Sequence, residues 1–347
     1  MNILIVGSSD IWAIEQHYSK HLNEIPGVNA TIFSTSTFNQ AHLNVVRQVE
    51  RRLAPSRNSL HHLFNQALLS AVHREKPDVV LVFKGMEIYP ETLEKINKVA
   101  FTANYNPDHP FFFSSRGSGN QNVRKSIGLY RLHFSYHKGV CARIEQEYNI
   151  PCHWLPFGYE LDESMYDEII REETAERMRV CFIGNPDAKR VQTIKHLLQH
   201  NIPVDVFGNH WNRYLRVQNG LNIFPPVYGK DYWRTLRAYR VQLNIFRPHN
   251  EGSHNMRSIE IPAVGGIMLA PDSEEHRQIL GVSGKYCYYY SNNIEIIAHI
   301  KIIINHSKDF TTKFRNNSEK HLNQGKCSYE NRAHELSNII IHINNTK

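Results

Sequence analysis

Hydrogen-bonding and charged side chains are concentrated in the segment "RPHNEGSHNMRSIE", residues 247 to 260. It follows the apolar run "QLNIF", which is typical of a buried strand. Polar groups beside a buried strand are costly unless they face solvent or a polar ligand. We expect Arg247, Asn255 and Arg257 to contact an anionic ligand and Glu260 to accept hydrogen bonds from ribose hydroxyls. The alternative is that Arg257 and Glu260 form a solvated i,i+3 pair on a helix.

A second candidate segment, "GNPDAKR", follows the apolar run "RVCFI". Gly184 allows the backbone to turn, Asn185 offers hydrogen-bond donors, and Arg190 falls at the start of an expected helix. Free N–H groups at a helix N-terminus and a nearby cation together form an anion site. The alternative is an ordinary strand-to-helix turn with solvated basic residues.

Elements that position these residues are short apolar runs bounded by Gly or Pro, alternating with helical patterns. Such alternation, once in each half of the chain, predicts two α/β units with parallel sheets. Ligands of these sheets bind at the carboxyl ends of the strands, where both candidate segments lie. The expected strands are residues 2–7, 77–85, 179–185, 204–208, 242–246 and 266–270. Residues 101–122, rich in turn formers and aromatics, are expected to form a mobile loop, and residues 163–178 a polar helix.

The length of 347 residues exceeds what a single hydrophobic core usually spans. We predict two Rossmann-like domains with a cleft between them. The N-terminal domain covers residues 1–160 and the C-terminal domain residues 161–325. Residues 326–347 form a helix that packs back toward the N-terminal domain.

The formal net charge of +7 favours an anionic partner. Basic residues are scattered, and only "RQVERR" (47–52) forms a cluster, which a solvated helix face explains most simply. A nucleic-acid partner is therefore not expected. Five cysteines without a C-x-x-C pair predict reduced thiols rather than disulfides or a zinc site. With no signal-peptide pattern and no uninterrupted apolar span, we expect a cytoplasmic protein without a transmembrane segment.

Several motifs together resemble the CgeB-like group of glycosyltransferases, named for a spore-maturation protein. The match is most specific over residues 244–270 and looser in the N-terminal half. The resemblance implies the GT-B fold, in which the C-terminal Rossmann-like domain holds a nucleotide-sugar. It also implies transfer of a hexosyl group from that donor, whose nucleotide is most commonly UDP. The motifs are "ILIVG…W", "DHPFFF", "WLPFGY", "FIGN…R", "VDVFG…W", "NIFRPHN", "NMRSIEIPAVGGIML" and "YYYSNNIEII".

The resemblance also implies residue roles. Glu260 matches the ribose-binding glutamate. In the family an A-x-G-like turn follows this glutamate, and here that turn ends at Gly265. Asn185 and Arg190 match diphosphate-binding positions, and Arg257 fits the arginine that precedes the glutamate. Retaining GT-B enzymes often have a second glutamate eight residues earlier, where this chain has Gly252. The stereochemical outcome is therefore open.

Glycosyl transfer develops negative charge on the departing nucleoside diphosphate, which a metal ion or fixed cations stabilise. The sequence has no D-x-D motif, and its histidine pairs lack an acidic companion at ligand spacing. We therefore expect Arg190, Arg257 and Arg247 to act without metal or other cofactor.

Candidates for a catalytic base that serves the acceptor are Asp10, Glu87 and Asp108, which follow expected strands or lie in the aromatic loop. Residues at such positions are individually more often caps or turn residues than catalytic groups. The acceptor itself, whether glycan, protein or small molecule, cannot be read from the sequence.

Two other classes of function stay open. One is a different GT-B enzyme, such as a UDP-sugar epimerase or a DNA glucosyltransferase. The other is a nucleotide- or carbohydrate-binding protein without catalysis, because fold does not fix function. A nicotinamide dehydrogenase is disfavoured, because "VGSSDIW" after the first strand is not G-x-G-x-x-G.

Overall fold

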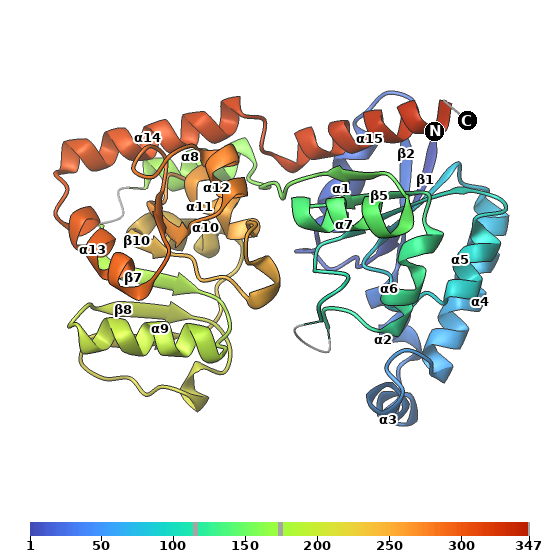
Figure 1. Cartoon of the computed structure of the whole chain (residues 1–347), viewed down its shortest axis with the longest axis horizontal. Helices are drawn as coiled ribbons and strands as arrows, with labels where there is room; N and C mark the ends of the chain where they lie inside the picture. The colour runs from blue at the N-terminus through green and yellow to red at the C-terminus, as the bar shows by residue number, and fades with distance from the viewer. Residues whose placement is uncertain (114–116, 173–175, 346–347) are drawn as a thin grey trace. The chain divides into compact units, whose positions relative to one another are not determined.

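The computed structural model describes residues 1–113, 117–172 and 176–345. The chain divides into two compact units (Figure 1). Unit 1 consists of Met1–Phe157 and Tyr329–Lys347, and unit 2 consists of Gly158–Ser328. The C-terminal helix thus belongs to unit 1, although it follows unit 2 in the sequence.

Unit 1 contains a six-stranded parallel sheet in the order β2-β1-β3-β4-β5-β6. The expected first strand at residues 2–7 is confirmed. The strands are β1 (Asn2–Gly7), β2 (Asn29–Ser34), β3 (Val79–Phe83), β4 (Phe101–Asn106), β5 (Leu132–Ser135) and β6 (Cys152–Trp154).

The expectation of a loop over residues 101–122 is wrong for its first six residues. They form β4, which is buried throughout and pairs with β3 and β5. The strand was missed because its sequence contains polar residues. One of them, Asn104, can be buried because its Nδ2 donates to the Val82 carbonyl at 3.0 Å. Residues 114–116 of the expected loop lie outside the described residues.

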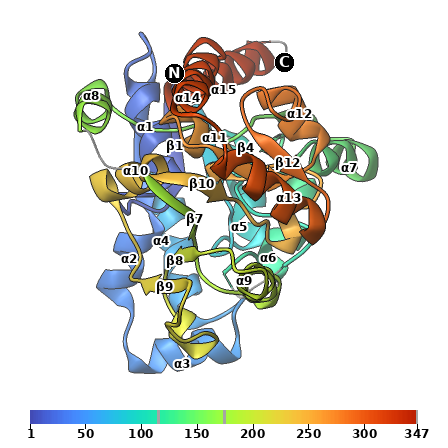
Figure 2. The same cartoon turned by 90° about the vertical axis from the view of Figure 1, so that its left-hand side faces the viewer.

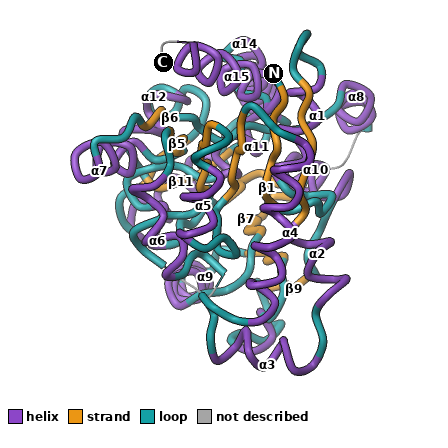
Figure 3. The backbone as a smooth tube through the Cα atoms, turned by 90° about the vertical axis from the view of Figure 1, so that its right-hand side faces the viewer, coloured by secondary structure: helices purple, strands orange, loops and turns teal. Residues whose placement is uncertain are grey.

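Helices cover both faces of the unit 1 sheet (Figure 3). Val80 and Val82 pack against α4 and α5, and on the other face Tyr18 of α1 contacts Phe83 and Tyr329, the first residue of α15. The helices are α1 (Ile14–Asn23), α2 (Thr35–His42), α3 (Val45–Leu53), α4 (Ser59–Glu75), α5 (Pro90–Ile96), α6 (Gln121–Ser126), the 3-10 helix η1 (Ile127–Leu129), α7 (Lys138–Tyr148) and α15 (Tyr329–Asn345).

Unit 2 contains a second six-stranded parallel sheet, in the order β12-β11-β10-β7-β8-β9. The strand order reverses between β7 and β10, which is where open α/β sheets bind ligands at the carboxyl ends of their strands. The strands are β7 (Arg177–Ile183), β8 (Val204–Phe207), β9 (Leu221–Phe224), β10 (Tyr239–Leu243), β11 (Met268–Pro271) and β12 (Tyr288–Tyr290).

The main core of unit 2 lies between its sheet and the helices α9 and α13, while α14 packs against α11 (Figure 2). The polar helix expected over residues 163–178 ends at Arg171; residues 173–175 lie outside the described residues, and β7 has begun by Arg177. The helices are α8 (Glu163–Arg171), α9 (Ala188–Gln199), η2 (Trp211–Arg213), α10 (Gly229–Ala238), η3 (Pro248–Asn250), α11 (Met256–Ala263), α12 (Glu274–Leu280), α13 (Asn293–Ile304) and α14 (Lys308–Gln324).

Within the described ranges, none of the helices combines the length and the apolar character that a membrane crossing requires. The five cysteines all lie in described segments, and each is a buried free thiol.

Candidate functional site

The loop after β7 lies at the point where the unit 2 strand order reverses. Gly184 has a φ of +154°, and a Cβ on Gly208 would lie 2.5 Å from the Gly184 carbonyl oxygen. The two glycines therefore allow the ends of β7 and β8 to approach closely. Asn185 fixes the turn, because its Oδ1 accepts a hydrogen bond from the Asn209 N–H at 2.9 Å. Its side chain is exposed at this edge.

Arg190 joins the loops after β7 and β10. It lies in the first turn of α9, which Asp187 caps by accepting from the Arg190 N–H at 3.0 Å. The guanidinium donates from Nη1 to the Asn185 carbonyl at 2.9 Å and from Nη2 to the Ile245 carbonyl at 3.0 Å. Burial lowers the pKa of Arg190 to about 10, against the opposing effect of Asp187. Arg190 is thus a cation that links the two loops through their backbone carbonyls.

Arg247 and Arg257 stand near Arg190 without partners of their own. Both are partly buried, and among the described residues neither side chain forms a hydrogen bond or an ion pair. The Nε of Arg257 is fully buried and unpaired. After the larger effect of burial, the positive charges of Arg257 and Arg247 also lower the pKa of Arg190, and Asp187 opposes them. Three arginines with two neighbouring carboxylates, Asp187 and Glu260, form a site at which an anion would be stabilised.

Glu260 lies one turn after Arg257 on α11. Its Oε2 accepts a hydrogen bond from the Tyr232 hydroxyl at 2.5 Å. Burial raises the pKa of Glu260, and the positive charge of Arg257 and the Tyr232 hydrogen bond partly oppose this effect. No ion pair joins Arg257 to Glu260 within the described residues, so the solvated-pair alternative does not describe them. Tyr232 left no signal in the sequence, because its role depends on how α10 and α11 lie together.

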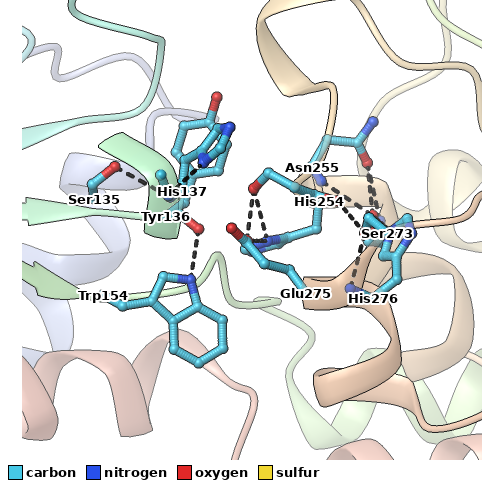
Figure 4. A network of polar contacts seen from close by, with 12 residues as sticks. Ser135, Tyr136, His137, Trp154, His254, Asn255, Ser273, Glu275 and His276 are labelled. Atoms are coloured by element: carbon cyan, nitrogen blue, oxygen red, sulfur yellow. Dashed lines mark hydrogen bonds and ion pairs between the residues drawn. The ribbon is translucent and has the colours of Figure 1, made fainter. Parts of the chain in front are cut away.

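A buried hydrogen-bond network holds the start of α11 (Figure 4). Asn255 is the N-cap of this helix, and its Oδ1 accepts from the Ser258 N–H at 3.1 Å. Its Nδ2 donates to Asn244 Oδ1 at 2.9 Å, and Asn244 Nδ2 donates back at 3.0 Å. The predicted ligand-contacting side chain of Asn255 is therefore engaged in capping α11, the helix that carries Arg257 and Glu260.

Two histidines extend this network to α12. Ser258 Oγ lies 2.7 Å from His276 Nε2, and His276 Nδ1 donates to the Pro271 carbonyl at 2.8 Å. Burial lowers the pKa of His276 to about 3, so the ring is neutral. His254 Nδ1 donates to Glu275 Oε2 at 2.8 Å, and both side chains are buried. His254 and Ser258 lie in the polar segment 247–260, whereas their partners Glu275 and His276 lie on α12 and gave no signal in the sequence.

Gly265 lies in the turn between α11 and β11, at the amino end of β11. Its φ is +70°, and a Cβ here would overlap the ion pair of Arg237 and Glu319. Gly265 therefore allows close packing against this ion pair, and its position does not indicate a contact with a nucleotide. Pro262 stands in the last turn of α11, which ends at Ala263.

The carboxyl edge of the unit 1 sheet carries the expected acceptor-side residues. Asp10 is exposed after β1, Glu87 is partly buried after β3, and Asp108 follows β4 in an ion pair with Lys84 at 2.6 Å. Glu15 of α1 was not expected here. Its Oε1 accepts a hydrogen bond from the Ser8 N–H at 3.0 Å, and burial raises its pKa. In the sequence it looks like an ordinary first-turn carboxylate.

In the parts of the chain that the structure describes, no three His, Cys, Asp or Glu side chains gather in a way that could hold a metal ion.

Comparison with known proteins gives a family match that covers most of unit 2 and the start of α15. A family model described as "Glycosyl transferase-like" matches residues 189–338, which include all three arginines and Glu260. The match covers 150 of the 347 residues and extends from unit 2 into the first part of α15. No curated protein matches the chain significantly.

Solved structures match nearly the full chain. Sucrose-phosphate synthase from Thermosynechococcus elongatus has a TM-score of 0.71 at 8% identity and covers 100% of both chains. Anabaena HepE in complex with UDP-glucose has a TM-score of 0.65 at 12% identity, over 99% of this chain and 100% of HepE. A putative UDP-N-acetylglucosamine 2-epimerase from Listeria monocytogenes has a TM-score of 0.60 at 11% identity, over 100% and 97%. At these identities the match shows the fold: two Rossmann-like domains of the GT-B class.

Proposed function

We propose that this protein is a glycosyltransferase whose unit 2 binds the diphosphate and ribose of a nucleotide-sugar. Residues 161–325 are the proposed donor domain and residues 1–160 the acceptor-side domain. A UDP-sugar is the proposed donor, and the CgeB-like group, on the motifs of residues 244–270, is the proposed family. A cytoplasmic location stays a prediction.

The observation that carries this proposal is the unbalanced positive charge of Arg190, Arg247 and Arg257. A buried or half-buried guanidinium without a partner is unfavourable, and the buried Nε of Arg257 gains no hydrogen bond from any residue that the structure describes. A diphosphate supplies several anionic oxygens, so it can accept from more than one arginine at once. Arg190 is already bound to two carbonyls, so Arg247 and Arg257 are the proposed direct contacts.

Glu260 supports a nucleoside rather than a free anion. Its Oε2 is held by Tyr232, while no hydrogen bond to Oε1 is found within the described residues. A fixed carboxylate with one oxygen available accepts a ribose hydroxyl, as the acidic residue of dinucleotide-binding folds does. Tyr232 is a positioning residue in this arrangement, because it orients the carboxylate rather than contacting the nucleotide.

The chemistry follows from this placement of charge. The bond between the sugar's anomeric carbon and the diphosphate oxygen breaks as the acceptor oxygen forms its bond to the same carbon. Negative charge grows on the departing diphosphate, where Arg247 and Arg257 stabilise it. Because these cations are fixed parts of the fold, we propose that the transfer requires no metal ion.

On the acceptor side, the carboxyl edge of the unit 1 sheet offers candidates for the group that receives the acceptor proton. Glu15 joins the predicted Asp10, Glu87 and Asp108 there. Its pKa, raised by burial, brings it closer to the range of a general base than an exposed carboxylate. At the same edge, the buried Nδ2 of Asn106 has no hydrogen-bond partner among the described residues, so this edge can still bind a polar group.

A nucleotide-sugar epimerase is the second candidate. Proteins named UDP-N-acetylglucosamine 2-epimerase are among the structural matches, at TM-scores close to those of the other matches. The proposed nucleotide contacts would serve either reaction, so the product decides between them.

The test is incubation of the purified full chain with UDP-glucose and UDP-N-acetylglucosamine, followed by product analysis by NMR. A glycosyltransferase releases UDP. The release is slow when the sugar is transferred to water and faster when an acceptor from a glycan library is added. An epimerase instead inverts a sugar carbon while the sugar remains nucleotide-linked. If the chain binds UDP but changes neither donor with any acceptor, it is a binding protein and the transferase proposal fails.

A further inference from the structure

Helix α3 presents an apolar surface that its own unit does not cover. All of its residues are described, and none is buried. Figures 1 and 3 show it away from the strands of the unit 1 sheet. At about 100° per residue, four of its apolar side chains fall on one stripe roughly 100° wide. They are Val45 (77% exposed), Val46 (66%), Val49 (48%) and Leu53 (81%).

The helix is well defined even though it adds nothing to a core. Asn44 caps it by accepting from the Arg47 N–H at 2.9 Å. The Arg47 guanidinium donates from Nη1 to the His42 carbonyl at 2.6 Å. Glu50 accepts hydrogen bonds from the backbone and hydroxyl of Ser59, the first residue of α4. Polar contacts thus attach α3 to its neighbours and leave the apolar stripe free.

The charges of α3 indicate what the stripe contacts. Arg47, Arg51 and Arg52 stand outside the stripe, and the single carboxylate, Glu50, is directed to Ser59. Arginine side chains on the polar face of such a helix can extend to phosphate groups while aliphatic side chains enter the layer below. Amphipathic helices with this division lie in the interface of a bilayer, with their apolar face at the boundary of headgroups and acyl chains.

We propose that α3 docks unit 1 on an anionic membrane surface. The stripe is aliphatic, convex and only about two turns long, so it lacks the area of a stable protein interface but suits shallow insertion between lipids. Attraction of the three arginines to anionic headgroups adds to the apolar contribution. This proposal is independent of the proposed glycosyltransferase activity.

The experiment is co-sedimentation of the full chain with vesicles of phosphatidylcholine alone and of phosphatidylcholine with phosphatidylglycerol at 7:3. Binding to the anionic vesicles is expected, and it should weaken steeply as the salt concentration rises from about 50 to about 500 mM, because salt screens the attraction to the arginines. Binding to neutral vesicles should be weak. The variant Val49→Ser/Leu53→Ser should lose at least about tenfold in partitioning. Arg51→Gln/Arg52→Gln should lose about fivefold for each arginine.

Matched controls come from exposed residues elsewhere. Val217→Ser and Arg216→Gln, both on an exposed loop of unit 2, should leave vesicle binding unchanged. Because α3 has no buried residue, its variants should keep the wild-type melting temperature and UDP affinity, which separates this test from that of the proposed function.

Failure of the wild type to bind anionic vesicles would overturn the proposal. So would binding that Val49→Ser/Leu53→Ser leaves intact. Sedimentation velocity adds a further outcome: if the same variant converts a dimer to a monomer, the stripe is an interface between copies of this chain and not a membrane surface.

Discussion

Replacing Arg257 should separate nucleotide binding from stability. In the proposed complex, Arg257 donates a charge-assisted hydrogen bond to the diphosphate, an interaction worth about 1.5 to 3 kcal/mol. Arg257→Gln should therefore weaken UDP binding by about 10- to 150-fold. The loss should be smaller for UMP, because the second phosphate adds charge that a nearby cation senses.

The stability of the unliganded protein should change little. Arg257 makes no hydrogen bond or ion pair among the described residues, and its charge lowers the pKa of Arg190. Removing it relieves this repulsion and also removes the attraction between Arg257 and Glu260, so the two effects partly cancel. Since Arg257 is partly exposed and solvent screens that repulsion, the free energy of unfolding should stay the same or rise by at most about 1 kcal/mol.

Calorimetric titration with UDP and UMP, paired with urea unfolding, measures both quantities. Arg216→Gln, at an exposed position of the same unit, is the matched control and should change neither. If Arg257→Gln loses stability and keeps its UDP affinity, the arginine has a structural role and the reasoning is refuted.

Four further outcomes are expected. UDP affinity should fall as pH decreases through the raised pKa of Glu260, and Glu260→Gln should abolish that pH dependence; an unchanged profile argues against ribose binding. Gly265→Ala should destabilise the protein by about 1 to 3 kcal/mol, because its φ of +70° is strained for alanine and its Cβ displaces an ion pair, whereas an unchanged urea midpoint contradicts the packing role. The folded-state pKa of His276, lowered to about 3, contributes stability that is present above pH 6.5 and lost toward pH 3, by at most about 1.4 kcal/mol per unit; His276→Gln should flatten this slope and the exposed control His200→Gln should not. EDTA should leave UDP release unchanged, and restoration by Mn²⁺ after a loss would contradict catalysis by fixed cations.

The sequence predicted the strands well where they are continuous apolar runs. Continuous apolar runs such as residues 2–7 predicted buried parallel strands, and the alternation with helices predicted two Rossmann-like domains, as found. It failed at β4, where Asn104 is buried but satisfied by a backbone carbonyl of the adjacent strand. Strand β10 lies at Tyr239–Leu243, ahead of the expected 242–246, because the segment after it is apolar and buried without belonging to the ladder.

Site residues close in sequence were easier to propose than their actual contacts. The density of polar groups after β10 drew attention to Arg247, Arg257 and Glu260, which the structure places at one end of the unit 2 sheet or on the helix that follows. Hydrogen-bond partners from other elements, Tyr232 above all, depend on helix packing that a local pattern does not encode. For the same reason the pattern could not show that the Asn255 side chain would be used as a cap.

The central claim, that the arginines and Glu260 of unit 2 bind a nucleoside diphosphate, is tested most directly by calorimetric titration of UDP into the wild type and into Arg247→Gln/Arg257→Gln. The account predicts saturable one-to-one binding to the wild type and a loss of about a hundredfold or more in the double variant, with folding intact. Equal affinity in the two proteins, or a wild type that binds none of UDP, GDP, dTDP, ADP and CMP, would contradict it.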